Sequence, residues 1–493
     1  METIGLLARK TCKQYANKVA VTAGEQSFTF SELSDRAQRI ANGLLAKGLS
    51  KGDRVAILMS NRYECIELDL AVAFSGLVKV PLNYRLHPKE HEYILEQSGA
   101  SIIIGEKELI QPIETSLPVI NVGEQYENLV STSSSSRVNV EVLEDDLYAI
   151  MYTSGTTGRP KGVMLSHRNF IAGALSLIMS CEITTEDVIG HVAPLTHGSN
   201  FLAQCSYILG NKQVVFSKFN PPEFIKDIHE EQVNIIFLVP TMVNLMIHDP
   251  SCDPSLLASL KSINMAGAPI AEEKLKKALE LLGPIFVETY GQVEAPMAIT
   301  CMPRHELSKR PLSCGATGPF VDMKIVNDDG EEVGQGDVGE VICFGSLVMQ
   351  GYWNNEEATR DTLKDGWLHT GDLGWIDEEG YLHLVDRKKD VIISGGANIY
   401  PREVEEVLSM HEAVKETSVF GIPDDKWGEV VYAHVVLRED ETVSEEELVE
   451  LCKKHLASFK KPKGIQFVEQ LPKSSYGKIL KKEIRKEYWS ENK

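Results

Sequence analysis

The sequence lacks the marks of a disulfide-stapled, metal-binding or membrane protein. Its nine cysteines are scattered over 493 residues, and no two of them form a C-x-x-C pair. An odd number of cysteines without metal-ligand spacing is typical of free thiols in a reducing compartment. No run of 18 apolar residues occurs, and the first ten residues, METIGLLARK, lack the apolar stretch of a signal peptide. We therefore expect a cytoplasmic protein without a membrane span.

Positively charged residues are also fewer than negatively charged ones. Lys and Arg number 50 against 71 Asp and Glu, which leaves a net charge of −21 at pH 7. Such an excess of negative charge disfavours nonspecific binding to nucleic acid and favours solubility. The residues after 450 are the exception, with 12 Lys and Arg against 4 Glu, and form either a phosphate-facing tail or a solvated helix surface. We expect small-molecule partners and no nucleic acid, and the oligomeric state, a homodimer included, stays open.

Short apolar runs alternate with helical patterns through the first two thirds of the chain. RVAILMS, ASIIIG, LYAIMYT and VNIIFLVP are typical of buried strands, and SELSDRAQRIANGLLAKG is typical of a helix. This alternation predicts an α/β fold with much parallel sheet. After about residue 320 the pattern changes to β-rich hairpins with turn signals such as DDG and EEG. We predict a large domain, residues 1–386, of parallel-rich sheets layered with helices plus a β-barrel-like subdomain, and a small α+β domain over residues 390–493.

The stretch YTSGTTGRPKGVMLSH at 152–167 directly follows the apolar run LYAIM. A polyphosphate site needs glycines that let backbone N–H groups approach, together with hydroxyl donors and a cation. The order of residues is not that of a Walker loop, and an ordinary glycine-rich strand-to-helix loop is the alternative. A plain linker in this chain, STSSSSR at 131–137, has hydroxyls but neither Gly nor Lys. We predict a phosphate-binding loop made of Thr153, Ser154, Gly155, Thr156, Thr157, Gly158 and Lys161.

This stretch resembles the signature phosphate-binding loop of the adenylate-forming enzymes, the superfamily of acyl-CoA synthetases, peptide-synthetase adenylation domains and beetle luciferases. Further segments resemble the other motifs of that family, in the same order and over nearly the whole chain. These segments are PLTHGS (194–199), MAGAPI (265–270), ETYGQVE (288–294), HTGDLG (369–374), VDRKKDVIISGGANIYPREVE (385–405) and PKSSYGKILKK (472–482). The resemblance implies an acyl-CoA synthetase that uses ATP, Mg²⁺ and coenzyme A.

The resemblance also implies roles for individual residues in adenylation. A carboxylate attacks the α-phosphate of ATP and pyrophosphate leaves, so the enzyme must supply cations and hydrogen-bond donors rather than a nucleophile. Glu294 would hold Mg²⁺, since hard cations prefer carboxylate oxygen. Lys478 would bridge the acid and the α-phosphate. The catalytic residues implied are Thr153, His197, Glu294 and Lys478.

The nucleotide is expected to lie between two of these motifs. The ring of Tyr290 would stack on adenine, with the MAGAPI turn on the other side, and Asp372 would bind the ribose hydroxyls. The implied nucleotide-binding residues beyond the loop are Gly267, Ala268, Pro269, Glu288, Thr289, Tyr290, Gly291, Gln292, Asp372, Arg387, Lys389 and Lys478.

The second half-reaction, in which the CoA thiol displaces AMP, requires Lys478 to leave the site. The resemblance implies rotation of residues 390–493 about a hinge at 387–389, with Lys389 as the pivot. Gly395 and Gly396 would then let the pantetheine arm of CoA pass close to the backbone, and His197 would gate the route of the thiol.

The acid-binding pocket implied by the resemblance is mostly apolar. It consists of His197, Phe201, Val239, Thr241, Gly291 and Pro296. No Lys or Arg is among them to hold a second carboxylate, and no Asp to hold an amino group. We therefore expect an apolar monocarboxylic acid, a fatty acid of short to long chain, with a benzoate- or cinnamate-type acid as the alternative.

One position departs from the family pattern. The family usually has Thr before the motif glutamate, and here that residue is Val293. A lost transition-state donor costs roughly 2.7–4 kcal/mol in a strong case. A degenerate nucleotide-binding regulator is therefore one alternative, and an adenylating enzyme that loads a carrier protein, or oxidises its adenylate as luciferases do, is another. SGGANIYP resembles the CoA ligases, which favours the ligase.

Overall fold

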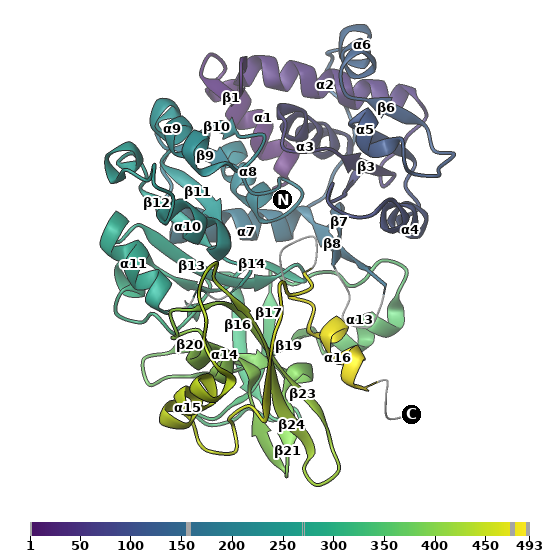
Figure 1. The fold of residues 1–493 in the computed structure, drawn as a ribbon. Coiled ribbons are helices and arrows are strands. Elements are labelled where there is room, and N and C mark those ends of the chain that lie inside the picture. The colour runs from purple at the N-terminus through teal and green to yellow at the C-terminus, as the bar shows by residue number, and fades with distance from the viewer. Residues whose placement is uncertain (1, 154–158, 269, 271, 474–478, 490–493) are drawn as a thin grey trace. The chain divides into compact units, whose positions relative to one another are not determined.

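The computed structural model describes residues 2–153, 159–268, 270, 272–473 and 479–489. The chain forms two compact units (Figure 1). The first consists of Met1–Pro269, Lys276–Met323 and Cys343–Leu368, and the second of Ile270–Leu275, Lys324–Ile342 and His369–Lys493. Among the described residues, no helix is long and apolar enough to cross a bilayer. All nine cysteines are free thiols.

A six-stranded sheet in the first unit carries the glycine-rich stretch. Its strand order is β6-β5-β3-β4-β7-β8, and every pair is parallel except β7–β8. The strands are β3 (Arg54–Leu58), β4 (Val78–Pro81), β5 (Ile102–Gly105), β6 (Val119–Asn121), β7 (Leu147–Thr153) and β8 (Lys161–Ser166). The continuous apolar runs of β3, β4 and β5 are typical of parallel strands covered on both faces.

A second sheet of the first unit runs in the order β15-β14-β13-β12-β11-β9-β10-β1-β2. Its centre, from β13 to β1, is parallel, and antiparallel pairs close each end. The strands are β1 (Val19–Ala23), β2 (Gln26–Thr29), β9 (Val188–His191), β10 (Lys212–Val215), β11 (Ile235–Leu238), β12 (Ser262–Met265), β13 (Phe286–Gln292), β14 (Ala295–Met302) and β15 (Gly315–Thr317). The predicted α/β fold with much parallel sheet is confirmed.

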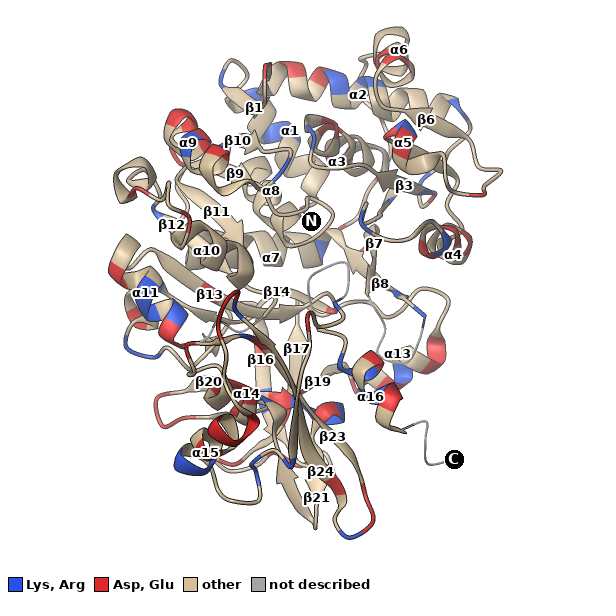
Figure 2. Cartoon of the chain, in the orientation of Figure 1, with Lys and Arg blue, Asp and Glu red and all other residues tan. Residues whose placement is uncertain are grey.

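Helices layer these sheets. Their bounds are α1 (Ile4–Gln14), α2 (Phe30–Ala46), α3 (Tyr63–Ser75), α4 (Pro88–Ser98), α5 (Lys107–Ile110), α6 (Glu124–Thr132), α7 (His167–Ser180), α8 (Gly198–Leu209), α9 (Pro221–Glu231), α10 (Pro240–Ile247), η1 (Pro254–Leu257), α11 (Glu272–Leu282), α12 (Arg304–Leu307) and α13 (Glu356–Thr362). Figure 2 shows charged residues on helices such as α9 and α11, whereas the sequence of α8 contains none. α3, α7 and α8 are buried along most of their length and share one core cluster with both sheets.

Local sequence explains where the helices begin and end. A reciprocal capping box opens α2, in which Thr29 N–H donates to Glu32 at 2.8 Å and Glu32 N–H donates to the Thr29 hydroxyl at 3.3 Å. α3 ends at Gly76, whose φ of 69° is the left-handed conformation that glycine adopts without strain. α3 is almost wholly buried although it contains three acidic residues, so these charges need partners inside the protein.

The region after residue 320 is β-rich, as expected. Four of its strands run in the order β16-β17-β19-β20, and β18 pairs with β19. Their bounds are β16 (Val321–Val326), β17 (Gly339–Gly345), β18 (Leu363–Lys364), β19 (Trp367–Ile376) and β20 (Tyr381–Arg387), followed by η2 (Lys388–Asp390). The hairpin β19–β20 sets Asp372 opposite Arg387.

The last hundred residues form an α+β body of the second unit. A sheet of order β22-β21-β24-β23, with β25 beside β24, is packed with α14 and α15 around one apolar core. The elements are β21 (Ile392–Ser394), β22 (Ala397–Ile399), α14 (Pro401–Leu408), β23 (Val414–Asp424), β24 (Gly428–Leu437), α15 (Glu445–His455), β25 (Gly464–Phe467) and α16 (Lys481–Trp489). Ser444 caps α15 as its sequence indicates, because its hydroxyl accepts a hydrogen bond from Glu447 N–H at 3.2 Å.

Candidate active site

The glycine-rich stretch connects two antiparallel strands rather than a strand and a helix. Thr153 ends β7 and Lys161 begins β8, and the two residues are paired across the hairpin. A hairpin differs from the strand-to-helix loop weighed above, so no helix N-terminus directly follows this stretch. Five of the predicted phosphate-binding residues lie outside the described residues: Ser154, Gly155, Thr156, Thr157 and Gly158.

Lys161 and Glu294 both contact one tyrosine, Tyr352, which lies outside the family motifs. The Lys161 ammonium lies 4.9 Å from the ring centre of Tyr352. The Tyr352 hydroxyl donates to Glu294 Oε1 at 2.8 Å. Burial, together with the neighbouring Glu294 carboxylate, raises the pKa of Tyr352 well above its ordinary value, so the phenol stays a donor at neutral pH. The predicted phosphate cation and the predicted magnesium carboxylate thus share a neighbour.

Backbone hydrogen bonds fix this arrangement. The Met349 N–H donates to the carbonyl of Glu294 at 2.8 Å. Two residues further on, Gly351 accepts from Met164 N–H at 2.9 Å, and that methionine belongs to β8. The segment that carries Tyr352 is therefore tied both to the predicted magnesium ligand and to the strand that follows the glycine-rich stretch. Val293, beside Glu294, packs its side chain against the core of the first unit.

The predicted adenine-binding residues follow neighbouring strands of the second sheet. Gly267 lies two residues after β12 with a φ of 89°, and a Cβ there would lie 4.0 Å from Val239 Cγ1. Val239 itself follows the adjacent strand β11. Tyr290 lies on β13, which pairs with β12. The carboxyl ends of parallel strands share one sheet edge, where α/β proteins bind ligands.

Other predicted residues of this edge are held by specific contacts. Thr289 is buried, and its hydroxyl accepts from Asn264 Nδ2 at 3.2 Å. At Gly291 a Cβ would lie 2.8 Å from the backbone nitrogen of Met297, so only glycine fits. The other residues predicted for the nucleotide and acid sites lie on β13 (Glu288 and Gln292), on β14 (Pro296), in α10 (Thr241) and after β12 (Ala268). Pro269 lies outside the described residues.

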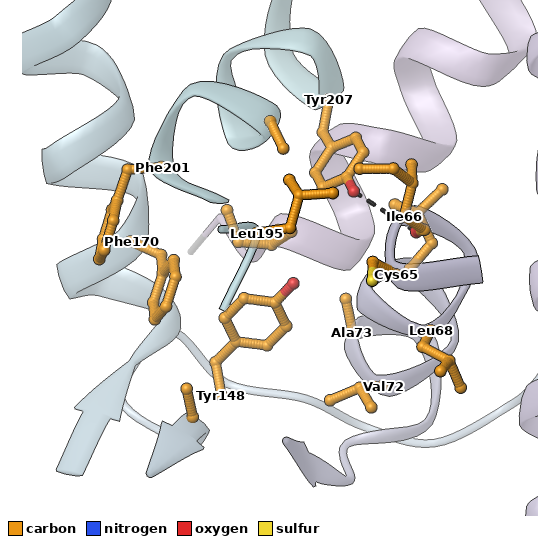
Figure 3. Close-up of a cluster of buried hydrophobic side chains, with 14 of the residues drawn as sticks. Cys65, Ile66, Leu68, Val72, Ala73, Tyr148, Phe170, Leu195, Phe201 and Tyr207 are labelled. Carbon is orange, nitrogen blue, oxygen red and sulfur yellow. Dashed lines mark hydrogen bonds between the residues drawn. The ribbon is translucent and has the colours of Figure 1, made fainter. Parts of the chain in front are cut away.

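His197 is the residue just before α8. Its Nδ1 lies 2.9 Å from the Thr196 hydroxyl oxygen. Burial lowers the pKa of His197 to about 4, so the imidazole is neutral at pH 7. One turn further on, Phe201 stacks on Phe170 with ring centres 4.5 Å apart (Figure 3). His197 and Phe201, both predicted for the acid pocket, are therefore uncharged rings at neutral pH.

The predicted ribose and hinge residues lie in the second unit. Arg387 Nε and Asp372 Oδ1 form an ion pair of 3.0 Å across the β19–β20 hairpin. Burial lowers the pKa of Lys389, and the Arg387 charge adds to that effect. Gly395 and Gly396 have φ values of 58° and 82°, which residues other than glycine rarely adopt. Lys478 lies outside the described residues.

Three sets of comparisons bear on what this site is. A family model described as "AMP-binding enzyme" matches residues 8–353, and one described as "AMP-binding enzyme C-terminal domain" matches residues 403–478. The chain belongs to the AMP-binding enzyme family. This membership confirms the family, the fold and the enzyme class, acyl-CoA synthetase, that the motifs indicate, and it supports ATP, Mg²⁺ and CoA as cofactors.

Relatives of this AMP-binding enzyme match it over almost its whole length. A feruloyl-CoA synthase from Amycolatopsis sp is 36% identical over 475 residues, which cover 95% of this chain and 96% of that protein. A long-chain-fatty-acid–CoA ligase, FadD13, from Mycobacterium tuberculosis (strain CDC 1551 / Oshkosh) is 34% identical over 505 residues, 99% of each chain. The crystal structure of ATP-bound MatB from Rhodopseudomonas palustris superposes with a TM-score of 0.92 at 30% identity, over 100% of each chain.

Proposed function

We propose that this enzyme activates an apolar monocarboxylic acid with ATP and transfers the acyl group to CoA. A fatty acid is the first candidate substrate. In the first step an acid oxygen bonds to the α-phosphorus and the bond to pyrophosphate breaks; in the second the CoA sulfur bonds to the carbonyl carbon and AMP leaves. The observation that carries the proposal is the meeting of Lys161 and Glu294 at Tyr352, beside the glycine-rich stretch.

The residues around Glu294 fit a magnesium ion. One carboxylate oxygen accepts from Tyr352, which orients the group and leaves its other oxygen for a cation. The described residues contain no cluster of three or more His, Cys, Asp or Glu side chains that could hold a metal. Mg²⁺ suits such a site because it keeps several waters and takes phosphate oxygens as ligands. Bound there, Mg²⁺ would neutralise charge on the phosphates.

Other residues would serve the two steps in turn. Lys161 would attract the leaving pyrophosphate, and the Asp372–Arg387 pair would present a carboxylate oxygen to the ribose hydroxyls. The neutral His197 would line the path of the acid without attracting phosphate. We further propose that residues 390–493 rotate about the hinge at 387–389, so that Lys478 serves adenylation and the Gly395–Gly396 turn serves thioester formation.

An aromatic acid is the second candidate substrate. The similarity to a feruloyl-CoA synthase, 36% identical over 475 residues, favours it. A panel of fatty and aromatic acids, assayed by CoA- and ATP-dependent AMP release, separates the two candidates.

Pyrophosphate release tests the reaction itself. We expect release that depends on the acid, and thioester formation with free CoA rather than with a carrier protein. The variant Lys478→Ala should lose adenylation, and Lys478→Arg should keep part of it. Failure to release pyrophosphate with any acid would favour the nucleotide-binding regulator, and full adenylation by Lys478→Ala would remove the lysine from its proposed role.

A further inference from the structure

Glu340 is a mostly buried carboxylate of the second unit, and the reaction proposed above gives it no task. It is the second residue of β17, and its side chain is 11% exposed. The residue before it, Gly339, lies so close to the neighbouring chain that a Cβ there would be 2.4 Å from the carbonyl oxygen of Val326. Close packing of the backbone therefore fixes the place from which this carboxylate extends.

One oxygen of Glu340 holds the turn that carries the predicted ribose carboxylate. Oε1 accepts a hydrogen bond from the N–H of Gly371, the residue directly before Asp372, at 3.1 Å. A second contact with β17 comes from Thr370, whose hydroxyl donates to the carbonyl of Val341 at 2.6 Å. The Asp372 N–H in turn donates to the Thr370 hydroxyl oxygen at 3.1 Å. The backbone at Asp372 is thus held in position by β17.

The other oxygen of Glu340 faces the predicted hinge. Oε2 accepts from the Lys388 ammonium at 3.4 Å, and His369 Nδ1 lies 3.3 Å from the same oxygen. Lys388 also pairs with Asp328 at 2.7 Å, but the Asp328 side chain is 88% exposed. Water screens an ion pair with so exposed a partner. Glu340 is therefore the better shielded of these two carboxylates at the hinge lysine.

A carboxylate can make both contacts at once. Each of its oxygens accepts hydrogen bonds, so one glutamate side chain reaches a backbone N–H and an ammonium together. A glutamine at position 340 would keep an acceptor for Gly371 but would offer Lys388 no negative charge. An alanine would lose both contacts. The two contacts can therefore be separated by substitution.

We propose that Glu340 is a positioning residue that ties the turn before Asp372 to the hinge at Lys388. This inference rests on the proposed function, in which Asp372 binds the ribose hydroxyls and the hinge rotates between the two half-reactions. Arg387 completes the link, because it pairs with Asp372 while the next residue, Lys388, pairs with Glu340. A shift of the ribose-binding turn would then also move the hinge residues.

Nucleotide binding tests the contact with the ribose-binding turn. We would measure by calorimetry the affinity of the full-length enzyme for AMP and for 2′,3′-dideoxy-AMP, which lacks the ribose hydroxyls. The wild type should prefer AMP by about 10-fold or more, the effect of a hydrogen bond to a charged group. Glu340→Ala should lose most of this preference, whereas Glu340→Gln should keep it. A Glu340→Ala enzyme that discriminates as the wild type does would overturn the proposal.

The two half-reactions test the contact with the hinge. Adenylation is measured as acyl-adenylate formation without CoA, and thioester formation as the reaction of preformed acyl-adenylate with CoA. Glu340→Gln and Lys388→Met should each change the ratio of these two rates in the same direction, by about two- to fivefold, as expected for a partly exposed ion pair. The double variant should match Lys388→Met, because that substitution already removes the pair. An unchanged ratio in both single variants, or changes of opposite direction, would overturn the proposal.

Glu332→Gln is the matched control. Its carboxylate pairs with Lys324 at 3.1 Å in the same unit, and the substitution removes one negative charge, as Glu340→Gln does. We expect the control to keep the wild-type preference for AMP and the wild-type ratio of rates. If it changed the ratio as Glu340→Gln does, charge alone would explain the effect and the proposal would be overturned. If Glu340→Ala does not fold, Glu340→Gln and Lys388→Met still decide the hinge contact.

The two kinds of measurement separate this inference from the ligase proposal. If no acid supports pyrophosphate release, the proposed function fails, and AMP binding by the Glu340 variants still tests the contact with the ribose-binding turn. If the wild-type enzyme forms the thioester but binds AMP and its dideoxy analogue equally well, the ligase proposal stands and this inference is overturned.

Discussion

Replacement of Tyr352 by phenylalanine would remove one hydroxyl from the candidate site and little else. The hydroxyl donates to Glu294 Oε1 at 2.8 Å, and the ring, 4.9 Å from the Lys161 ammonium, remains in place. A hydrogen bond to a charged acceptor contributes about 1.5–3 kcal/mol. At 1.36 kcal/mol per factor of ten this corresponds to a loss of about 10- to 150-fold in kcat/KM.

The assay is acid-dependent pyrophosphate release at several Mg²⁺ concentrations. If Tyr352 orients Glu294 for the cation, the variant needs more Mg²⁺ to reach half of its maximal rate. A double-mutant cycle with Glu294→Gln should give a coupling energy of about 1 kcal/mol or more, because the two side chains are in direct contact. Tyr488→Phe, which also loses hydrogen bonds of a tyrosine hydroxyl, is the control and should leave kinetics unchanged. A Tyr352→Phe enzyme with wild-type rate and Mg²⁺ dependence would refute the reasoning.

Three further variants give distinct outcomes. Val293→Thr restores the hydroxyl usual in the family, and we expect faster adenylation, by up to about 1000-fold if one transition-state donor is regained. An unchanged or lower rate in single-turnover assays would mean that another group already supplies this donor. Gly395→Ala places a Cβ 2.6 Å from the Trp427 ring at a φ of 58°, so we expect slower thioester formation with unchanged adenylation, measured with and without CoA. His191 is fully buried, and burial lowers its pKa from 6.5 to about 4. The unfolded chain therefore binds a proton that the folded chain does not, and the free energy of unfolding falls by about 1.4 kcal/mol per pH unit as the pH drops from about 6.5 to 4. Urea unfolding at several pH values should show a weaker pH dependence of this free energy for His191→Gln than for the wild type. An identical pH dependence would contradict this prediction.

Local patterns predicted much of the fold. The run RVAILMS became β3, LYAIMYT became β7, and the helix predicted from SELSDRAQRIANGLLAKG became α2. These elements follow from short-range causes, such as apolar periodicity and the capping box at Thr29 and Glu32. The predicted adenine-binding residues Gly267 and Tyr290 lie after β12 and on β13, which are neighbouring strands, and their role stays a prediction. The antiparallel hairpin of β7 and β8 on either side of the glycine-rich stretch could not be predicted from the stretch itself, because the pairing depends on residues outside it.

Residues far apart in the chain formed the contacts that sequence patterns missed. Tyr352 reaches Glu294 across 58 residues, and Asn200 reaches Lys79 across 121. For the Lys79–Asp69 ion pair, the only local signal was a lysine inside the apolar run LVKVPL. No local pattern indicated that Asp69, on α3, is its partner. Such a pair is recognised only in the folded core, because a buried charge is stable only beside an opposite charge.

The sequence by itself determined the family, the α/β character and the order of the motifs, because these depend on residue type and spacing along the chain. Only the tertiary structure decided which side chains share a site. It brought Lys161 and Glu294 to one tyrosine, and it enclosed Lys79 with Asp69 beside the His197 segment. The physical reason is that hydrogen bonds and buried ion pairs act over about 3 Å in space, whatever the distance between the residues in the chain.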